Sequence, residues 1–142
     1  MADQLPAFLE QYYEAARLFA RGDPEAVKAI YSHADDVVLA NPFGPASVGW
    51  DAVSPALDFA SSRFRDGDVD PFEVLARFDY GEMVVVHALE DWRARVADRP
   101  EVEPFRLRVT TVLRREDGGW RIVLRHADPI ATADASGPMR GR

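Results

Sequence analysis

The sequence predicts an α+β fold in which three N-terminal helices pack on a curved, mixed or antiparallel β-sheet. Two patterns support this prediction. In the first half of the chain apolar residues recur every three or four positions, which is the spacing of one helix face. In the second half they alternate with polar residues, which is typical of strands that have one face on a core. Helices that close one face of a curved sheet form a cone, and we expect a pocket in its interior.

Length and composition fit one domain with one hydrophobic core. The chain has 142 residues, of which 47% are hydrophobic. We expect a single domain over residues 1–130. Residues 131–142 are small and polar and contain glycine and proline, which favours a flexible tail.

The first two predicted helices follow each other closely. The first carries an apolar stripe from Leu5 to Phe19 and ends at Gly22, a residue suited to a left-handed helix stop. The second begins with Asp23 as N-cap and Pro24 in its first turn. Its buried stripe is predicted to consist of Val27, Ile30 and Tyr31.

A short strand and a third helix come next. The β-branched segment 37–40 predicts the strand, and the prolines within residues 41–45 end it because proline cannot donate to a ladder. In the third helix we expect Ser54 and Pro55 to be the cap and the first-turn residue, and Gly67 to be the stop.

The rest of the chain is predicted to be antiparallel strands. Residues 72–80 alternate, and residues 83–89 are a continuous apolar run, which is typical of a strand buried on both faces at the centre of a sheet. Residues 98–101 indicate a hairpin loop. Two further strands lie within residues 103–130, joined by a turn at residues 116–119.

The last strand is predicted to end in a polar group. Alternation places Trp120, Ile122, Leu124 and His126 on one side, so the apolar row ends in an imidazole. For the strand before it the sequence leaves open which of its two faces lines the cone.

Charge and composition exclude several classes of partner. With 17 Lys and Arg against 24 Asp and Glu, the net charge of −7 argues against nucleic acid or an anionic membrane as partner. The absence of cysteine excludes disulfides and a thiolate nucleophile. The N-terminus lacks the pattern of a signal peptide, and no apolar run is long enough to span a membrane. We expect a cytoplasmic protein.

No metal or cofactor is expected. The three histidines, His33, His87 and His126, lie on different predicted elements without the paired spacing of a metal site. Motifs of phosphate, dinucleotide and serine-nucleophile sites are also absent from the sequence.

Three stretches resemble the NTF2-like superfamily, and within it the SnoaL-like and ketosteroid-isomerase-like branch. They are GDPEAVKAIY, LANPFGPASVGW and RVTTVLRREDGGWRIVLRHADP, and the resemblance covers about residues 8–130. It implies an NTF2-like cone with an internal pocket. It does not imply one activity, because this superfamily includes isomerases, cyclases, dehydratases and accessory subunits.

The resemblance also implies that ketosteroid isomerisation in its known form is absent. That chemistry uses an aspartate as general base, and a tyrosine and a protonated aspartic acid as the oxyanion hole. By motif these three positions correspond to Asn41, a position on or near Ala15, and Thr110 or Thr111. An amide cannot take a proton from carbon at neutral pH.

His126 is the candidate catalytic residue. The SnoaL-like branch often has a histidine at this point, which implies a general acid or base facing the cavity. The alternative is a structural imidazole tied to Asp128, two residues further along the strand.

Glu90, Arg108 and Thr110 are candidates for the pocket wall, together with Asp128. If Arg108 points inward it needs a carboxylate, and Glu90 on the neighbouring strand is the predicted partner, since an unpaired buried charge is costly. The pair would clamp a ligand anion, or brace the sheet as a structural ion pair.

Three residues of the first half are further candidates for ligand contacts. Asn41 is a hydrogen-bond donor to a ligand carbonyl or the cap of the turn before Pro42. Tyr13 and Trp50 are apolar walls with a polar handle, or core residues. His87 is expected to be a satisfied core histidine.

These observations favour a pocket for a small, mostly apolar molecule that carries an oxygen. Proton transfer of the isomerase, cyclase or dehydratase type would use His126, with Arg108, Asn41 or Thr110 stabilising negative charge on oxygen. The alternative is a non-catalytic module with a structural network of Glu90, Arg108, His126 and Asp128. A homodimer through the sheet is expected in either case, because both faces of residues 83–89 are apolar.

Overall fold

The computed structural model describes residues 4–130, so the predicted tail at 131–142 lies outside the described residues. The helices are α1 (Leu5–Phe19), α2 (Glu25–Ile30) and α3 (Trp50–Ser62), and the strands are β1 (Val38–Ala40), β2 (Ser47–Val48), β3 (Phe64–Val69), β4 (Glu73–Tyr80), β5 (Met83–Val96), β6 (Val102–Glu116) and β7 (Gly119–Ile130). No helix within residues 4–130 is long and apolar enough to cross a membrane.

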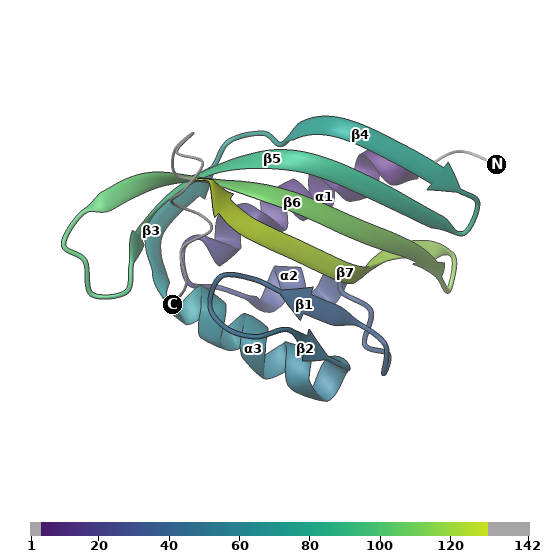
Figure 1. Cartoon of the computed structure of the whole chain (residues 1–142), viewed down its shortest axis with the longest axis horizontal. Coiled ribbons are helices and arrows are strands. Elements are labelled where there is room, and N and C mark those ends of the chain that lie inside the picture. Colours follow the sequence, from purple (N-terminus) through teal and green to yellow (C-terminus); the bar gives the residue numbers. More distant parts are fainter. Residues whose placement is uncertain (1–3, 131–142) are drawn as a thin grey trace, which may run out of the picture.

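The strands form one curved, mixed sheet, with the helices on one side of it (Figure 1). The order is β2-β1-β7-β6-β5-β3, and β4 pairs with the first half of β5. Only the β1–β7 pair is parallel among the described strands. The predicted α+β architecture is therefore confirmed.

The first two helices form where the apolar spacing predicts them. Gly22 follows α1 with a φ of 93°. Pro24, and not the predicted Asp23, is the N-cap of α2, although the Asp23 side chain accepts a hydrogen bond from the Glu25 backbone N–H at 3.1 Å. The predicted stripe of α2 is buried: Val27, Ile30 and Tyr31 are at most 6% exposed.

The third helix begins earlier than Ser54, so the predicted cap is wrong. The backbone N–H groups of Ala52 and Val53 bond to the Gly49 carbonyl, which closes the first turn before Pro55 is reached. Pro55 then lies inside α3. Gly67 does not stop this helix but belongs to β3, a strand that alternation failed to reveal because a bulge between Arg65 and Asp68 interrupts its register.

Alternation decides which side chains of the long central strands face the helices. On β5 the buried residues are Val84, Val86, Ala88, Glu90, Trp92 and Ala94. On β6 they are Leu107, Val109, Thr111 and Leu113. Arg108 and Thr110 therefore belong to the outer face of the sheet. This answers the question that the sequence leaves open, namely which face of β6 lines the cone.

A bulge in β7 reverses the predicted parity of the last strand. Leu113 pairs with Ile122 and Val112 pairs with Leu124, so Val123 is an extra residue without a partner on β6. Ile122 and Val123 are both buried. Beyond the bulge Arg125 and Ala127 face the helices, whereas Leu124 and His126 face outward. The row predicted to end in His126 ends instead in Arg125 and Ala127.

The hairpin between β6 and β7 has the predicted turn. Asp117 and Gly118 both have positive φ angles, 50° and 81°, which a two-residue turn of this hand requires.

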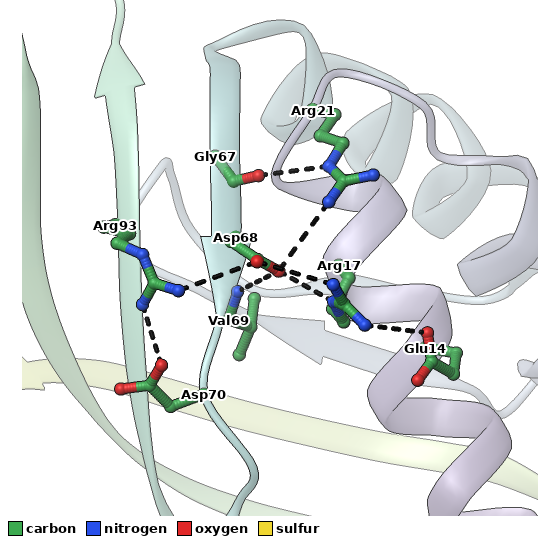
Figure 2. Close-up of polar contacts among 8 residues, drawn as sticks. All are labelled: Glu14, Arg17, Arg21, Gly67, Asp68, Val69, Asp70 and Arg93. Atoms are coloured by element: carbon green, nitrogen blue, oxygen red, sulfur yellow. Dashed lines mark hydrogen bonds and ion pairs between the residues drawn. The ribbon is translucent and has the colours of Figure 1, made fainter.

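Close contact and an ion-pair cluster hold the end of α1 against the sheet. A Cβ at Gly67 would lie 2.5 Å from the Ala20 carbonyl oxygen, so only glycine fits there. Beside it, Asp68 on β3 is 2.8 Å from Arg17 on α1 and 3.6 Å from Arg93 on β5 (Figure 2). This cluster fixes α1, which carries Tyr12, over the inner face of the sheet.

Candidate functional site

A cavity of about 50 Å³ lies between the three helices and the inner face of the sheet. Its wall is mostly apolar and rich in rings, contributed by Tyr12, Phe19, Tyr31, Phe43, Phe64 and Trp92. Among the described residues that line it, polar side chains come from Tyr12, Tyr31, Asn41 and Arg125, and none is a carboxylate or an imidazole. An apolar space with a few convergent polar groups is typical of a ligand site.

Arg125 and Glu90 form a buried ion pair at the edge of this cavity. Arg125 donates from Nη1 and Nη2 to the two carboxylate oxygens of Glu90, both at 2.9 Å. Trp92 Nε1 also donates to Glu90, at 3.0 Å. The side chains of Arg125 and Glu90 are only 12% and 2% exposed. The bidentate geometry satisfies the buried charges, as such a pair requires.

The field of Glu90 keeps Arg125 charged. Burial is the largest single influence and lowers the pKa of Arg125, but the charge and hydrogen bonds of Glu90 together with the influence of Tyr12 and Tyr31 outweigh it, and the pKa lies well above the ordinary arginine value. The site therefore contains a fixed guanidinium whose charge is matched by a fixed carboxylate.

Tyr12 joins this pair from α1. Arg125 Nη1 donates to the Tyr12 hydroxyl oxygen, and Thr111 Oγ1 lies 3.4 Å from the same hydroxyl. Burial is the largest influence on the phenol and raises its pKa, although Arg125 acts in the opposite direction. Tyr12 therefore stays protonated and neutral.

Tyr31 is a further polar residue in the wall of the cavity. The residue is 1% exposed, and its hydroxyl has no hydrogen-bond partner among the described residues. Burial raises the pKa of this phenol too, and Arg125, which lowers it, is close enough to act on it. A buried donor without a partner is unusual and needs an explanation, and a bound oxygen atom would supply one.

The backbone holds Tyr31 in place at the end of α2. Tyr31 is extended, with φ −81° and ψ 151°, and forms a bridge to Ile122 of β7. The next backbone N–H, of Ser32, donates to the Ile122 carbonyl at 2.8 Å. The phenol is thus positioned by the sheet as well as by the helix.

Of the predicted ligand contacts in the first half of the chain, Asn41 lines the cavity. Its side-chain oxygen also accepts a hydrogen bond from the Phe43 backbone N–H at 3.1 Å, so it caps the turn as well. Trp50 lies outside this site and stacks on His33, with 3.9 Å between ring centroids. Tyr13 lines a separate groove of about 370 Å³ between α1 and the sheet.

His126 and Asp128 lie on the outer face of the sheet, away from the cavity. Their side chains are 56% and 52% exposed, and His126 Nε2 is 3.0 Å from Asp128. The expectation that His126 faces the cavity is wrong because of the β7 bulge. The tie to Asp128, which was the alternative, is present.

Arg108 and Thr110 also lie on the outer face. Arg108 is exposed, and Thr110 bonds to His87 Nδ1 at 2.9 Å. The predicted pairing of Glu90 with Arg108 is therefore wrong: Glu90 is buried as expected, but its partner is Arg125.

Sequence reasoning missed Tyr12, Tyr31 and Arg125 as site residues. The signal for Arg125 was present: three apolar residues in a row, 122–124, interrupt the alternation of the last strand and mark the bulge. Tyr12 lies one turn before Ala15, the position expected to correspond to a tyrosine, and so reaches the same side of the helix.

Chemically, the arrangement can bind and polarise an oxygen atom. Two neutral phenols and an amide are donors, and the guanidinium beside them supplies a fixed positive charge. Nowhere in residues 4–130 do three or more His, Asp or Glu side chains gather as a metal site would need.

Comparison with solved structures supports the fold. A ketosteroid isomerase-like protein from Erwinia carotovora atroseptica superposes with a TM-score of 0.74 at 22% identity, over 93% of this chain and 100% of that one. An NTF2-like superfamily protein from Salmonella enterica gives 0.72 at 18% identity, over 94% and 98%. An NTF2-like protein of unknown function from Pseudomonas putida gives 0.67 at 19% identity, over 92% and 87%. At these identities the likeness concerns the fold alone.

Sequence comparison identifies the family. No curated protein sequence matches the chain. The family model of the SnoaL-like domain, however, matches residues 5–132, which is nearly the whole chain. The protein belongs to the SnoaL-like domain family and has the NTF2-like fold.

Proposed function

We propose that the protein binds a small, neutral, mostly apolar carbonyl compound in the internal cavity, with the carbonyl oxygen accepting a hydrogen bond from Tyr31. The observation that carries this proposal is the buried Tyr31 hydroxyl, which has no partner among the described residues and belongs to a residue that lines an apolar, ring-rich space. A ligand oxygen that pairs with it removes the cost of an unmade hydrogen bond.

The ion pair favours a neutral ligand over an anion. Both oxygens of Glu90 are engaged by Arg125, so the pair as a whole carries no net charge. A ligand carboxylate would have to lose its hydration without finding an unmatched cation, which is costly. A ketone or lactone oxygen has a much smaller desolvation cost and still benefits from the nearby guanidinium.

The size of the cavity favours a molecule with one ring. A cavity of about 50 Å³ exceeds the ~10–15 Å³ that one water molecule needs, so it has room for more than a single water molecule. A six-membered cyclic ketone is of this order of size.

The same wall favours binding over proton transfer from carbon. Such a reaction needs a general base within hydrogen-bond reach of the substrate. The lining residues that the structure describes offer phenols, an amide and a guanidinium, all of them hydrogen-bond donors with high or no relevant pKa. We therefore favour a ligand-binding role over the isomerase or dehydratase role.

Calorimetry with cyclohexanone tests the proposal on the parent protein and Tyr31→Phe. We expect the parent to bind and the variant to bind about fivefold more weakly, because one hydrogen bond to a neutral group contributes about 1 kcal/mol. The variant should unfold within about 1 kcal/mol of the parent, since the hydroxyl has no bond within the described protein to lose.

Two controls make the result specific. His126→Gln should bind cyclohexanone like the parent, because His126 lies on the outer face. Benzoate, an anion of similar size, should bind much more weakly than cyclohexanone. Equal affinities of the parent and Tyr31→Phe for cyclohexanone, or a preference for benzoate, would contradict the proposal.

The outer face supports a second proposal, that two copies pair through the sheet. An apolar row crosses six strands on this face, formed by residues paired in register: Phe78, Val85, Val112, Leu124, Val38 and Val48. Its ends are well exposed, with Phe78 at 50% and Val48 at 62%. A continuous apolar row of this length is typical of an interaction surface.

A further inference from the structure

Phe43 lines the internal cavity and also two larger hollows beside it. The ring lines the cavity of about 50 Å³, a hollow of about 440 Å³ at the mouth of the cone, and another of about 210 Å³ beside β2 and α3. One side chain that borders all three spaces is a partition between them.

The partition toward the mouth consists of four residues, because the cavity and the larger hollow share Pro42, Phe43, Phe64 and Leu107. Two of these are fixed by the core. Leu107 is 7% exposed on the central strand β6, and Phe64 is 6% exposed on β3. Phe64 also packs on Phe105, Trp92 and Phe19, with centroid distances of 5.8, 5.6 and 6.2 Å.

Phe43, in contrast, is held weakly. It lies in the loop between β1 and β2, and it is only half-buried. Its ring contacts Phe64 edge-on at 5.5 Å and Phe59 at 6.3 Å, and Phe59 is itself 52% exposed. Of the four partition residues, Phe43 is the large side chain that can move without disturbing a strand.

We propose that the Phe43 ring is the gate of the cavity and sets the upper size limit of its ligands. With the ring in place the cavity takes a one-ring ketone. With the ring displaced the cavity joins the mouth hollow and takes two- and three-ring ketones. This inference rests on the proposed function, because the ketone oxygen still bonds to Tyr31 in either case.

The experiment measures the affinity of cyclohexanone, 1-tetralone and 9-fluorenone, which have one, two and three rings, for the parent and Phe43→Ala. We expect the parent to bind 9-fluorenone at least tenfold more weakly than cyclohexanone. In Phe43→Ala we expect 9-fluorenone to gain at least tenfold in affinity while cyclohexanone changes little. The affinity of Phe43→Leu for 9-fluorenone should lie between the affinities of the parent and Phe43→Ala. Because leucine keeps most of the apolar contact, this variant also tests the gate if the alanine variant does not fold.

Phe78→Ala is the matched control. It removes a more exposed phenylalanine from the outer face of β4, which does not line the cavity, and should leave the size limit of the parent unchanged. The proposal is overturned if the parent binds all three ketones alike, or if Phe43→Ala and Phe78→Ala show the same limit as the parent.

A second readout separates failure of the gate from failure of the proposed function. Trp92 lines the cavity, whereas Trp120 lines neither the cavity nor the two hollows that border Phe43. In a Trp50→Phe background, opening the partition should increase quenching of Trp92 by acrylamide in Phe43→Ala, with no ketone present. If acrylamide quenches Trp92 more strongly in Phe43→Ala but no ketone binds to any variant, the gate is supported and the proposed carbonyl ligand is contradicted. Unchanged quenching rejects the gate even if cyclohexanone binds.

Discussion

At the scale of single residues, the polar end of the cavity depends on one buried carboxylate and one buried guanidinium. Glu90 fixes the orientation of Arg125, and Arg125 in turn donates to the Tyr12 hydroxyl. A pair of this kind is costly to break from either side, because the remaining charge stays buried without a partner.

A double-mutant cycle tests this dependence. Glu90→Gln and Arg125→Met should each lower the free energy of unfolding by about 3–5 kcal/mol, and the double variant should lose clearly less than the sum of the two. Urea denaturation measures all four proteins. The exposed pair Asp91 and Arg106, also in close contact at 2.7 Å, serves as the control and should show only weak coupling. Additive losses for Glu90 and Arg125 would show that the pair does not act as a unit.

The sequence predicts whether such a residue is buried better than it predicts which residue it pairs with. The sequence predicts that an arginine facing the cone needs a carboxylate and that Glu90 supplies it, and Glu90 does pair with a buried arginine. The identity of the cation depends on the register of β7, and one extra residue, Val123, moves Arg125 inward and His126 outward. Bulges change parity without changing the composition of a strand, so alternation alone could not decide between the two residues.

At the scale of elements, the attachment of α1 to β3 and β5 depends on Asp68. The carboxylate bonds to Arg17 and lies near Arg21 and Arg93. The hydrogen bond from Arg17 is the main reason that the pKa of Asp68 is lowered, and burial opposes it. A carboxyl with a lowered pKa stabilises the folded protein above its unfolded pKa of about 3.9, and this stabilisation is lost as the pH falls through the folded value.

Asp68→Asn should therefore lower the melting temperature by about 3 °C at pH 7, a modest effect because the cluster is partly exposed. As the pH falls below about 4, the parent should lose this advantage and the two melting curves should converge. Asp117→Asn, in the exposed β6–β7 turn, is the control and should follow the parent throughout. A constant difference between parent and Asp68→Asn down to pH 2 would exclude the ionised carboxylate as the cause.

Regular elements are predictable from the sequence here, and irregular ones are not. The apolar spacing predicts α1, α2, β5 and β6, because each buries one continuous face. Alternation also predicts β4 and β7 as strands, although β4 is exposed on both faces and the bulge in β7 changes its buried face. The local pattern predicts Gly67 as a helix stop, whereas its role is to let β3 approach the end of α1. That role depends on a tertiary contact, which no local pattern contains.

At the scale of the whole molecule, the curved sheet separates two surfaces with different tasks. Its inner face forms the cavity with the helices, and its outer face carries the apolar row from Phe78 to Val48. Pairing of two copies through the outer face leaves both cavities free, so we expect dimerisation and ligand binding to be independent.

Light scattering on the purified protein tests the pairing. The parent should have about twice the chain mass of 15.9 kDa, and Val112→Glu, in the centre of the row, should have the mass of one chain. Leu18→Glu, at an exposed apolar position on α1, should remain a dimer. A parent that is a monomer at all concentrations would reject the pairing, and so would a Val112→Glu variant that stays dimeric.

The central claim is that a neutral carbonyl oxygen completes the hydrogen bonding of Tyr31 inside the cavity. A crystal structure of the protein with cyclohexanone tests it most directly. We expect the ring to lie among Phe19, Leu57 and Trp92, with its oxygen about 2.8 Å from the Tyr31 hydroxyl oxygen. Cyclohexanone bound in either of the two hollows outside the cavity, or beside His126, with no contact to Tyr31, would contradict this claim.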